Sequence, residues 1–201
     1  MEKGSDVRTP DYPIDSVFVD RWSPRAMSGA PVSDQELLTL FEAARWAPSS
    51  GNSQPWRILY ARRDTPQWPT FLGLLVPSNQ AWAHRASALL VFLSRHLRER
   101  DGKPQVTHAF DTGAAWVSLA FQGNLKGYVV HGMEGFDYAR ARTELEVPPE
   151  FTVHAMVAIG RPGAIADLPE NQRKRESPND RRPLEQTICE GKFALANPTG
   201  T

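Results

Sequence analysis

Apolar positions recur at helical spacing near residue 40 of the chain. Leu37 and Leu38 are adjacent, and Phe41 and Ala44 follow them at intervals of three or four residues. Ser33 stands three residues before Glu36, which is the signature of a capping box at a helix N-terminus. The pattern predicts a helix from about Ser33 to Trp46, which Pro48 stops.

A second and longer helical pattern runs from about Val106 to Lys126. Its apolar residues, three or four apart, are Phe110, Ala114, Val117, Phe121 and Leu125. Gly127 follows directly and is placed to end the helix as a left-handed cap. We expect this segment to be the central helix of the fold.

Between and after these helices the chain alternates between strand patterns and shorter helical patterns. The predicted strands are Trp56–Ala61, Ser87–Ser94, Tyr128–His131 and Phe151–Ile159, the last closed by Gly160. Thr65 and Pro66 read as the cap and first residue of a short helix that carries Phe71, Leu72 and Leu75. Asp137 is placed to cap another helix that runs to Leu145.

The ends of the chain show no regular pattern. From Gly163 to Pro183 the sequence is polar and basic and reads as an extended arm. We find no internal repeat and no second domain, so residues 1–201 are expected to form a single domain. Residues 1–14 and 189–201 are expected to be extended or flexible.

Composition excludes several classes of protein. The chain has 23 basic and 23 acidic residues, so no global field favours a nucleic acid or an anionic membrane as partner. Cys189 is the only cysteine, which excludes an intrachain disulfide and favours a reducing compartment. The first thirty residues carry charges throughout, and the most apolar run, Ala86–Leu93, is too short to cross a bilayer. We expect a soluble, cytoplasmic protein.

Two polar segments carry groups suited to a ligand. Arg21, Ser23 and Arg25 alternate in position, so in an extended segment their side chains point the same way and could surround one oxyanion such as phosphate. A solvated basic strand end is the alternative. The loop Pro48–Pro55 gathers hydrogen-bonding groups that suit the edge of a heteroaromatic ring, namely those of Ser49, Ser50, Asn52 and Gln54. Its alternative is an ordinary connection between helix and strand.

A third segment, His131 to Gly135, follows a predicted strand. Its two glycines would let backbone N–H groups approach a ligand closely, although a tight turn would use them too. His131 and Glu134 lack a third ligand at metal-binding spacing, so we expect no metal site. The common hydrolase, dinucleotide-binding and P-loop motifs are absent from the sequence.

Taken together, these segments resemble the FMN-dependent nitroreductase family in order, spacing and type, from about Asp15 to Ile188. The resemblance implies that Arg21, Ser23 and Arg25 hold the FMN phosphate and ribityl chain, with Arg181 as a further phosphate ligand. Trp22 stands between them where many relatives carry Arg or His. The family's Pro-Ser-Ser-x-Asn-x-Gln-Pro-Trp loop is nearly complete here, which implies that five residues line the ribityl chain and pyrimidine edge: Pro48, Ser49, Ser50, Asn52 and Gln54.

Met133, Glu134 and Gly135 resemble the family's glycine turn, which presents a backbone N–H to flavin N5. The resemblance also implies an α+β fold with a central, mainly antiparallel sheet flanked by helices. The protein would be a homodimer with FMN at the interface and with terminal arms exchanged between subunits.

The activity that the resemblance implies is a ping-pong transfer of electrons. NADH or NADPH would deliver hydride to flavin N5, and a small acceptor such as a nitroaromatic or quinone would then take the electrons. No side chain need act as acid or base. Reductive dehalogenation, alkene reduction, flavin fragmentation and flavin binding without turnover are open alternatives. Trp68, Phe71 and Trp82 could roof the acceptor pocket or belong to the core.

Overall fold

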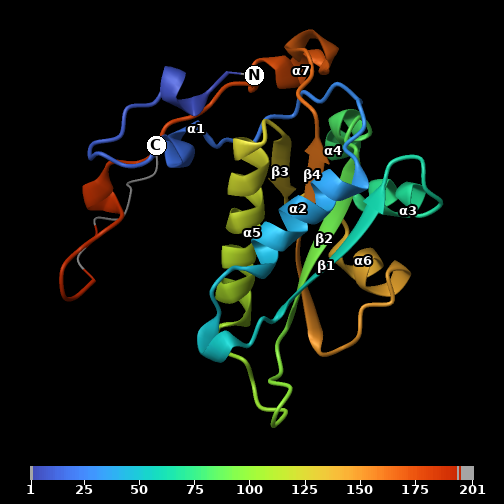
Figure 1. The fold of residues 1–201 in the computed structure, drawn as a ribbon, viewed down its shortest axis with the longest axis vertical. Coiled ribbons are helices and arrows are strands. Elements are labelled where there is room, and N and C mark those ends of the chain that lie inside the picture. Colours follow the sequence, from blue (N-terminus) through green and yellow to red (C-terminus); the bar gives the residue numbers. More distant parts are fainter. Residues whose placement is uncertain (1, 194, 196–201) are drawn as a thin grey trace.

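The structure is a computed structural model and describes residues 2–193 and 195. Its centre is a sheet of four strands: β1 (Trp56–Arg62), β2 (Ala88–Arg95), β3 (Val129–Met133) and β4 (Phe151–Gly160). The strands lie in the order β1-β2-β4-β3, and each neighbouring pair is antiparallel (Figure 1). All four strands were predicted within one or two residues at each end, and the α+β class with an antiparallel sheet is confirmed.

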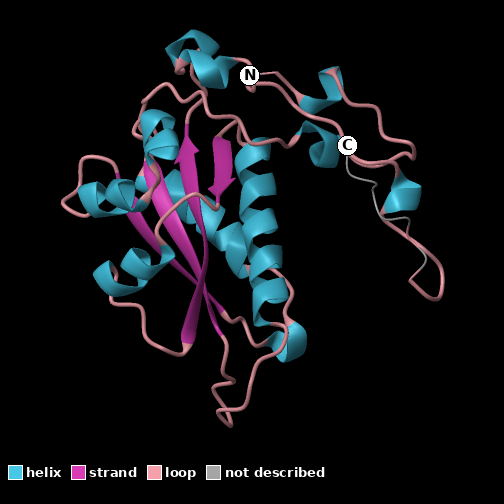
Figure 2. Ribbon diagram, turned by 180° about the vertical axis from the view of Figure 1, so that it is seen from behind, coloured by secondary structure: helices cyan, strands magenta, loops and turns pink. Residues whose placement is uncertain are grey.

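Helices cover both faces of this sheet (Figure 2). Helices α2 (Asp34–Arg45) and α5 (His108–Leu125) pack on one face, and α3 (Trp68–Leu74), α4 (Pro77–Ala83) and α6 (Tyr138–Glu144) pack on the other. The short helices α1 (Ser16–Asp20) and α7 (Glu170–Arg173) belong to the terminal segments. Short 3-10 turns occupy Gly4–Asp6, Ser50–Asn52, Ile165–Asp167 and Leu184–Gln186. In the described part of the chain, no helix is both long enough and apolar enough to cross a membrane.

Alternate residues of β2 face two separate hydrophobic cores, as the period of a strand requires. Leu89, Val91 and Leu93 pack with buried side chains of α3, α4 and α6. Leu90 and Phe92 point to the other face and pack with α2 and α5. The strand is buried from Ala88 to Ser94, which explains why its sequence is a nearly continuous apolar run.

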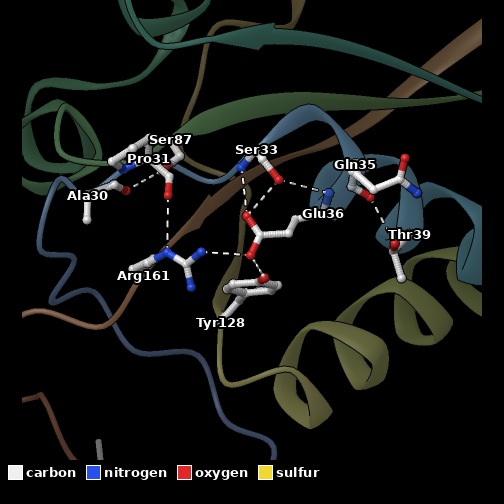
Figure 3. A network of polar contacts seen from close by, with 9 residues as sticks. All are labelled: Ala30, Pro31, Ser33, Gln35, Glu36, Thr39, Ser87, Tyr128 and Arg161. Carbon is white, nitrogen blue, oxygen red and sulfur yellow. Dashed lines mark hydrogen bonds and ion pairs between the residues drawn. The ribbon is translucent and has the colours of Figure 1, made fainter.

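The predicted capping box opens α2. Ser33 Oγ accepts a hydrogen bond from the backbone N–H of Glu36 at 3.3 Å, and the Glu36 carboxylate accepts from the backbone N–H of Ser33 at 2.7 Å. The same carboxylate accepts from the Tyr128 hydroxyl at 2.5 Å and from Arg161 at 2.7 Å (Figure 3). These bonds, that of Tyr128 first, lower the pKa of Glu36 to about 2. They tie the start of α2 to β3 and β4.

The prediction for the first short helix was wrong at both ends. Thr65 Oγ1 donates to the carbonyl of Arg62 at 2.7 Å, so Thr65 belongs to the turn that leaves β1 rather than to a helix cap. Helix α3 therefore begins at Trp68, and Leu75 lies beyond its end. Helix α4 was not predicted, although Pro77 at its first position is a known start signal.

The polar arm predicted from Gly163 to Pro183 is not extended throughout. It contains the 3-10 turn at Ile165–Asp167 and the single turn of α7. Arg173 stabilises this region because its guanidinium donates to the carbonyls of Leu168 and Ala166, both at 2.8 Å. Of the expected flexible C-terminal segment, residues 194 and 196–201 lie outside the described residues.

The apolar stripe of α5 lies on the outer face of the helix. Phe110, Val117 and Leu125 are 82%, 36% and 67% exposed, whereas the buried side of the helix is made of small residues and Leu119. Gly127 ends the helix with φ 73°, as predicted. The helix was predicted correctly, but its predicted apolar face is exposed and does not pack in the chain's own core.

Candidate functional site

A cavity of about 460 Å³ lies between the N-terminal segment, β3 and the C-terminal arm. We call it the arginine cavity, because five arginines line it: Arg8, Arg21, Arg25, Arg175 and Arg181. Ser23 and Trp22 also line it, so the structure brings together Arg21, Ser23 and Arg25 as their alternation predicted. Arg181 reaches the same cavity from the distant end of the chain.

The arginine cavity has an excess of positive charge. Burial lowers the pKa of Arg21, and the charges of Arg181 and Arg8 lower it further. Among the described residues, no carboxylate lies within ion-pair distance of these three side chains. Arg21 contacts Ser23 instead, with 3.4 Å between Nη1 and Oγ. An anion with several oxygens would neutralise the charge and accept these donors.

Glu176 fastens the C-terminal arm to the wall of this cavity. Its Oε1 accepts from the backbone N–H groups of Arg25 at 2.6 Å and Ala26 at 2.7 Å, and its Oε2 lies 3.8 Å from Arg25 Nη1. The carboxylate is buried. Sequence reasoning missed Glu176, although it directly follows three basic residues, and that contrast was a usable signal.

Two further residues, Arg8 and Trp22, hold the N-terminal segment against the cavity. Arg8 donates to the carbonyl of Asn179 at 2.7 Å and to that of Val19 at 2.8 Å, which joins the two ends of the chain. Trp22 is buried, and its Nε1 donates to the carbonyl of Glu2 at 2.9 Å. Trp22 therefore anchors the first residues of the chain. The sequence carried no signal that distinguished Arg8 from its charged neighbours.

His131 supports the cavity from β3. Its ring is buried, its Nδ1 lies 2.9 Å from the carbonyl oxygen of Pro24, and it packs against Trp82 with ring centroids 4.7 Å apart. Burial lowers the pKa of His131 to about 4, so the ring is neutral at pH 7 and Nδ1–H donates to Pro24. His131 therefore holds the Arg21–Arg25 segment on the sheet.

A second cavity of about 460 Å³ lies beside the first, and Ser23 lines both. It runs between α5 and the strands β2, β3 and β4, and we call it the apolar cavity. Phe92, Trp116 and Val157 contribute apolar walls. Met133 and Glu134, both predicted as site residues, line it as well. The two cavities together offer a charged end and a flat, apolar continuation.

Gly135 lies just behind the apolar cavity and has a fixed orientation. Its carbonyl accepts from the backbone N–H of Val76 and from Asn79 Nδ2, both at 3.1 Å. A Cβ at this position would stand 2.7 Å from Asn79 Nδ2, so only glycine fits without displacement. In the described part of the chain we find no acceptor for the Gly135 N–H.

The predicted polar loop is strained and separate from both cavities. Gly51, Asn52 and Gln54 have φ of 58°, 54° and 46°, and such values cost energy for the two residues that are not glycine. Ser49 Oγ accepts from the backbone N–H of Gln54 at 3.0 Å, which stabilises this shape. Pro48 and Ser50 are exposed, as are Asn52 and Gln54. The loop lines a third cavity of about 340 Å³ with Arg95, Arg98 and Gln105 of the same chain, and its exposed side chains remain accessible.

The loop and the arginine cavity lie at opposite ends of α5 (Figure 1). Ser50 donates its backbone N–H to Asp111 at the start of the helix, at 3.3 Å. Phe18, which precedes Arg21, packs edge-on against Phe121 near the other end, with ring centroids 5.0 Å apart. The helix is about 27 Å long, as estimated from the usual rise per residue. One chain therefore does not bring all the predicted site residues together.

The aromatic residues left open between pocket and core belong to the core. Trp68, Phe71 and Trp82 are buried in the cluster between the sheet and α3, α4 and α6. They line neither the arginine cavity nor the apolar cavity.

The fold is α+β, and its described residues line a cavity rich in arginine that shares Ser23 with a more apolar cavity. Comparison with known proteins identifies the family. Residues 19–67 match the model described as the nitroreductase family. A relative from Rhodopseudomonas palustris (strain TIE-1), named as an NADH dehydrogenase/NAD(P)H nitroreductase, is 34% identical over 183 residues, 82% of this chain and 92% of its own length.

A second relative, the NADH dehydrogenase of Thermus thermophilus, is 27% identical over 84% of this chain and 91% of its own. Among solved structures, one described as an oxidoreductase containing FMN is 46% identical and superposes with a TM-score of 0.90, covering 94% of this chain and 97% of its own. The chain belongs to the nitroreductase family of oxidoreductases.

Proposed function

We propose that the protein binds FMN, with the phosphate in the arginine cavity and the flavin ring extending along the apolar cavity. The observation that carries this proposal is that Ser23 lines both the arginine cavity and the apolar cavity, which are therefore neighbours. Arg21 and Arg181 offer charges that the described chain does not neutralise, and a phosphate dianion suits such donors. Phe92 and Trp116 suit an aromatic ring. The 46% identical structure that contains FMN supports the same ligand.

The glycine turn supplies the next element of the proposal. Flavin, when bound, accepts a hydride at N5 and gives up electrons from its reduced form. Gly135 would offer its N–H as the donor to N5. The carbonyl of the same peptide, that of Glu134, accepts from the backbone N–H of Phe136 at 2.9 Å, and the bonds from Val76 and Asn79 hold the next peptide. A fixed donor requires no reorganisation when charge develops on the cofactor.

We infer that the complete site is formed by two copies of the chain. Because the polar loop and the arginine cavity lie at opposite ends of α5, a two-fold axis across this helix would bring the loop of one subunit to the cavity of the other. The exposed apolar face of α5 would be covered in the same assembly. Asn52 and Gln54 would then reach the ring edge of the partner's flavin, and the terminal arms would wrap the neighbouring subunit.

The proposed reaction follows from the cofactor and from the family. NADH or NADPH delivers hydride, departs, and leaves the site open to a small oxidised acceptor such as a nitroaromatic or a quinone, in a ping-pong sequence. The names of the relatives from Rhodopseudomonas palustris and Thermus thermophilus support a nicotinamide as the donor.

This function is tested by anaerobic titration of the purified, FMN-loaded protein. We expect NADH or NADPH, in an amount nearly equal to the bound FMN, to bleach the flavin absorbance band. Nitrobenzene derivatives or benzoquinone should restore it. A colourless protein that does not bind added FMN would contradict the cofactor assignment. A yellow protein that neither nicotinamide reduces would contradict the oxidoreductase cycle but leave flavin binding intact.

Arg21→Ala is expected to weaken FMN binding roughly 10- to 100-fold, because a charge-assisted hydrogen bond to phosphate contributes about 1.5 to 3 kcal/mol. Fluorescence titration of the apoprotein with FMN measures this change. Arg45→Ala is the matched control, since Arg45 is exposed on α2 and pairs only with Glu42 among the described carboxylates. Equal FMN affinity in the Arg21 variant and the control would remove the phosphate assignment.

A further inference from the structure

The ladder between β2 and β4 contains one irregularity, and it falls at a histidine. Phe92 pairs with Ala155, but the next residue of β2, Leu93, pairs with Val153. His154 is therefore the extra residue of a β-bulge. A bulge redirects a side chain relative to the strict alternation of a strand, and bulges are frequent beside active sites.

The redirected ring of His154 contacts a buried serine. Ser94 is fully buried, and its Oγ lies 2.5 Å from His154 Nε2 and 2.6 Å from His108 Nδ1. A hydroxyl has a single proton to donate, so it donates to one ring and accepts an N–H from the other. Both rings are thereby fixed in orientation. In the described part of the chain, no group of three or more candidate ligands could hold a metal ion, so this cluster is a hydrogen-bonding network.

His154 lines the apolar cavity at the end far from the arginines. Ala158 pairs with His131, whose ring bonds the Arg21–Arg25 segment, and His154 lies four residues earlier on β4. The separation along the strand is about 13 Å at the usual rise per residue. Apart from Glu134, His154 is the only ionisable side chain that lines this cavity among the described residues.

The surroundings of His154 favour its neutral form. Burial lowers its pKa, and the neighbouring ring of His108 lowers it further. The other ionisable groups near the cluster include Asp111 on α5, His96 after β2, Glu134 after β3, and Tyr138 on α6, whose hydroxyl donates to the carbonyl of His154 at 3.2 Å. The ring therefore gains its proton only below the ordinary range of histidine, and the protonated form is a comparatively strong acid.

We propose that His154 is a catalytic acid that protonates an oxygen of the electron acceptor, with Ser94 as the positioning residue. This inference rests on the proposed function, since a quinone-like acceptor receives its electrons there. Reduction of a quinone to a hydroquinone requires two electrons and two protons. A hydride supplies both electrons and one proton, and an acid supplies the second proton. The N–H bond of the imidazolium breaks, an O–H bond forms on the acceptor, and the neutral ring regains its proton from solvent.

The test compares two acceptors that differ in their need for protons. Benzoquinone takes up two electrons and two protons, whereas ferricyanide takes up one electron and no proton. The FMN-loaded protein is reduced with dithionite, and reoxidation is followed by stopped flow. With His154→Gln we expect reoxidation by benzoquinone to slow about 100-fold, as for loss of a general acid, and reoxidation by ferricyanide to be unchanged. His84→Gln, at an exposed histidine on the end of α4, is the control and should match the wild type with both acceptors.

Ser94→Ala should slow only the benzoquinone reaction and by a smaller factor, because the acid remains but its ring is no longer held. Equal rates in His154→Gln and wild type overturn the proposal, and so does equal slowing with both acceptors, which would indicate a structural role.

The wild-type protein provides a measurement that does not depend on a variant's folding. Its benzoquinone rate should fall as pH rises through a pKa below the ordinary value of histidine, whereas a flat profile overturns the proposal. Since dithionite replaces the nicotinamide, failure of the NAD(P)H reaction is a separate result.

Discussion

Phe110→Asp is expected to convert the protein to a monomer that does not retain FMN. Phe110 is 82% exposed in the single chain, so the substitution removes no core contact. It is also the third residue of α5, where a carboxylate is favourable beside the positive end of the helix dipole. The helix should therefore remain intact. In the proposed two-fold interface, a charged carboxylate would replace a buried apolar ring twice, which should weaken association by at least about 100-fold.

Sedimentation velocity over a range of protein concentrations measures the association, and the absorbance of bound flavin is read in the same experiment. Ile165→Asp is the matched control, because Ile165 is an exposed apolar residue that lies outside α5. The control should remain dimeric and yellow. A Phe110→Asp protein that stays dimeric and keeps its FMN would exclude α5 from the interface.

The second large effect is expected from mixing two defective chains. One carries Arg21→Ala, and the other carries Asn52→Gly with Gln54→Gly, which removes the loop's amides at positions whose positive φ glycine accepts. If cavity and loop come from different subunits, each mixed dimer contains one intact site and one site with both defects. With random pairing, about a quarter of all sites should then bind FMN with wild-type affinity.

Titration of the refolded mixture with FMN distinguishes the two arrangements. Each variant alone should show no high-affinity phase, and neither should a mixture of the two that has not been dissociated and refolded. If the complete site lay within one chain, every site in the mixture would carry one of the two defects. No high-affinity phase would then appear, and the proposal of a shared site would fail.

The sequence predicted the sheet and the two long helices because their burial follows a simple period. Ser33 and Glu36 form the capping box that the spacing indicated, and Gly127 ends α5 as expected. The start of α3 was misplaced because Thr65 can cap a helix or close a turn, and the tertiary course of the chain selects the turn. Local pattern does not decide between such alternatives.

The candidate site shows a different limit. Alternation was enough to group Arg21, Ser23 and Arg25, because it depends only on an extended backbone. The separation of the polar loop from this group could not be predicted, since it depends on how α5 spans the sheet. The sequence pattern also did not predict that the apolar stripe of α5 points outward. A helical period does not indicate whether the chain itself or a second copy covers an apolar face.

Sequence reasoning placed neither His154 nor Glu176 among the candidate site residues, and the reasons are physical. The strict alternation expected of a strand does not include a bulge, and it is the bulge that directs His154 to the side of Ser94 and α5. Glu176 stands out in sequence after three basic residues, but its partners lie about 150 positions away, so the sequence does not indicate what it binds.

The attachment of the C-terminal arm through Glu176 has a kinetic consequence for the cofactor. The bonds from Arg25 and Ala26 to this carboxylate, and those from Arg8 to Asn179, must break before the arm that carries Arg181 can move away from the cavity. An FMN held there would exchange with the surroundings at the rate at which the arm detaches, not at the rate of its own diffusion. The flavin would then behave as a resident prosthetic group through many catalytic cycles, while nicotinamide and acceptor come and go.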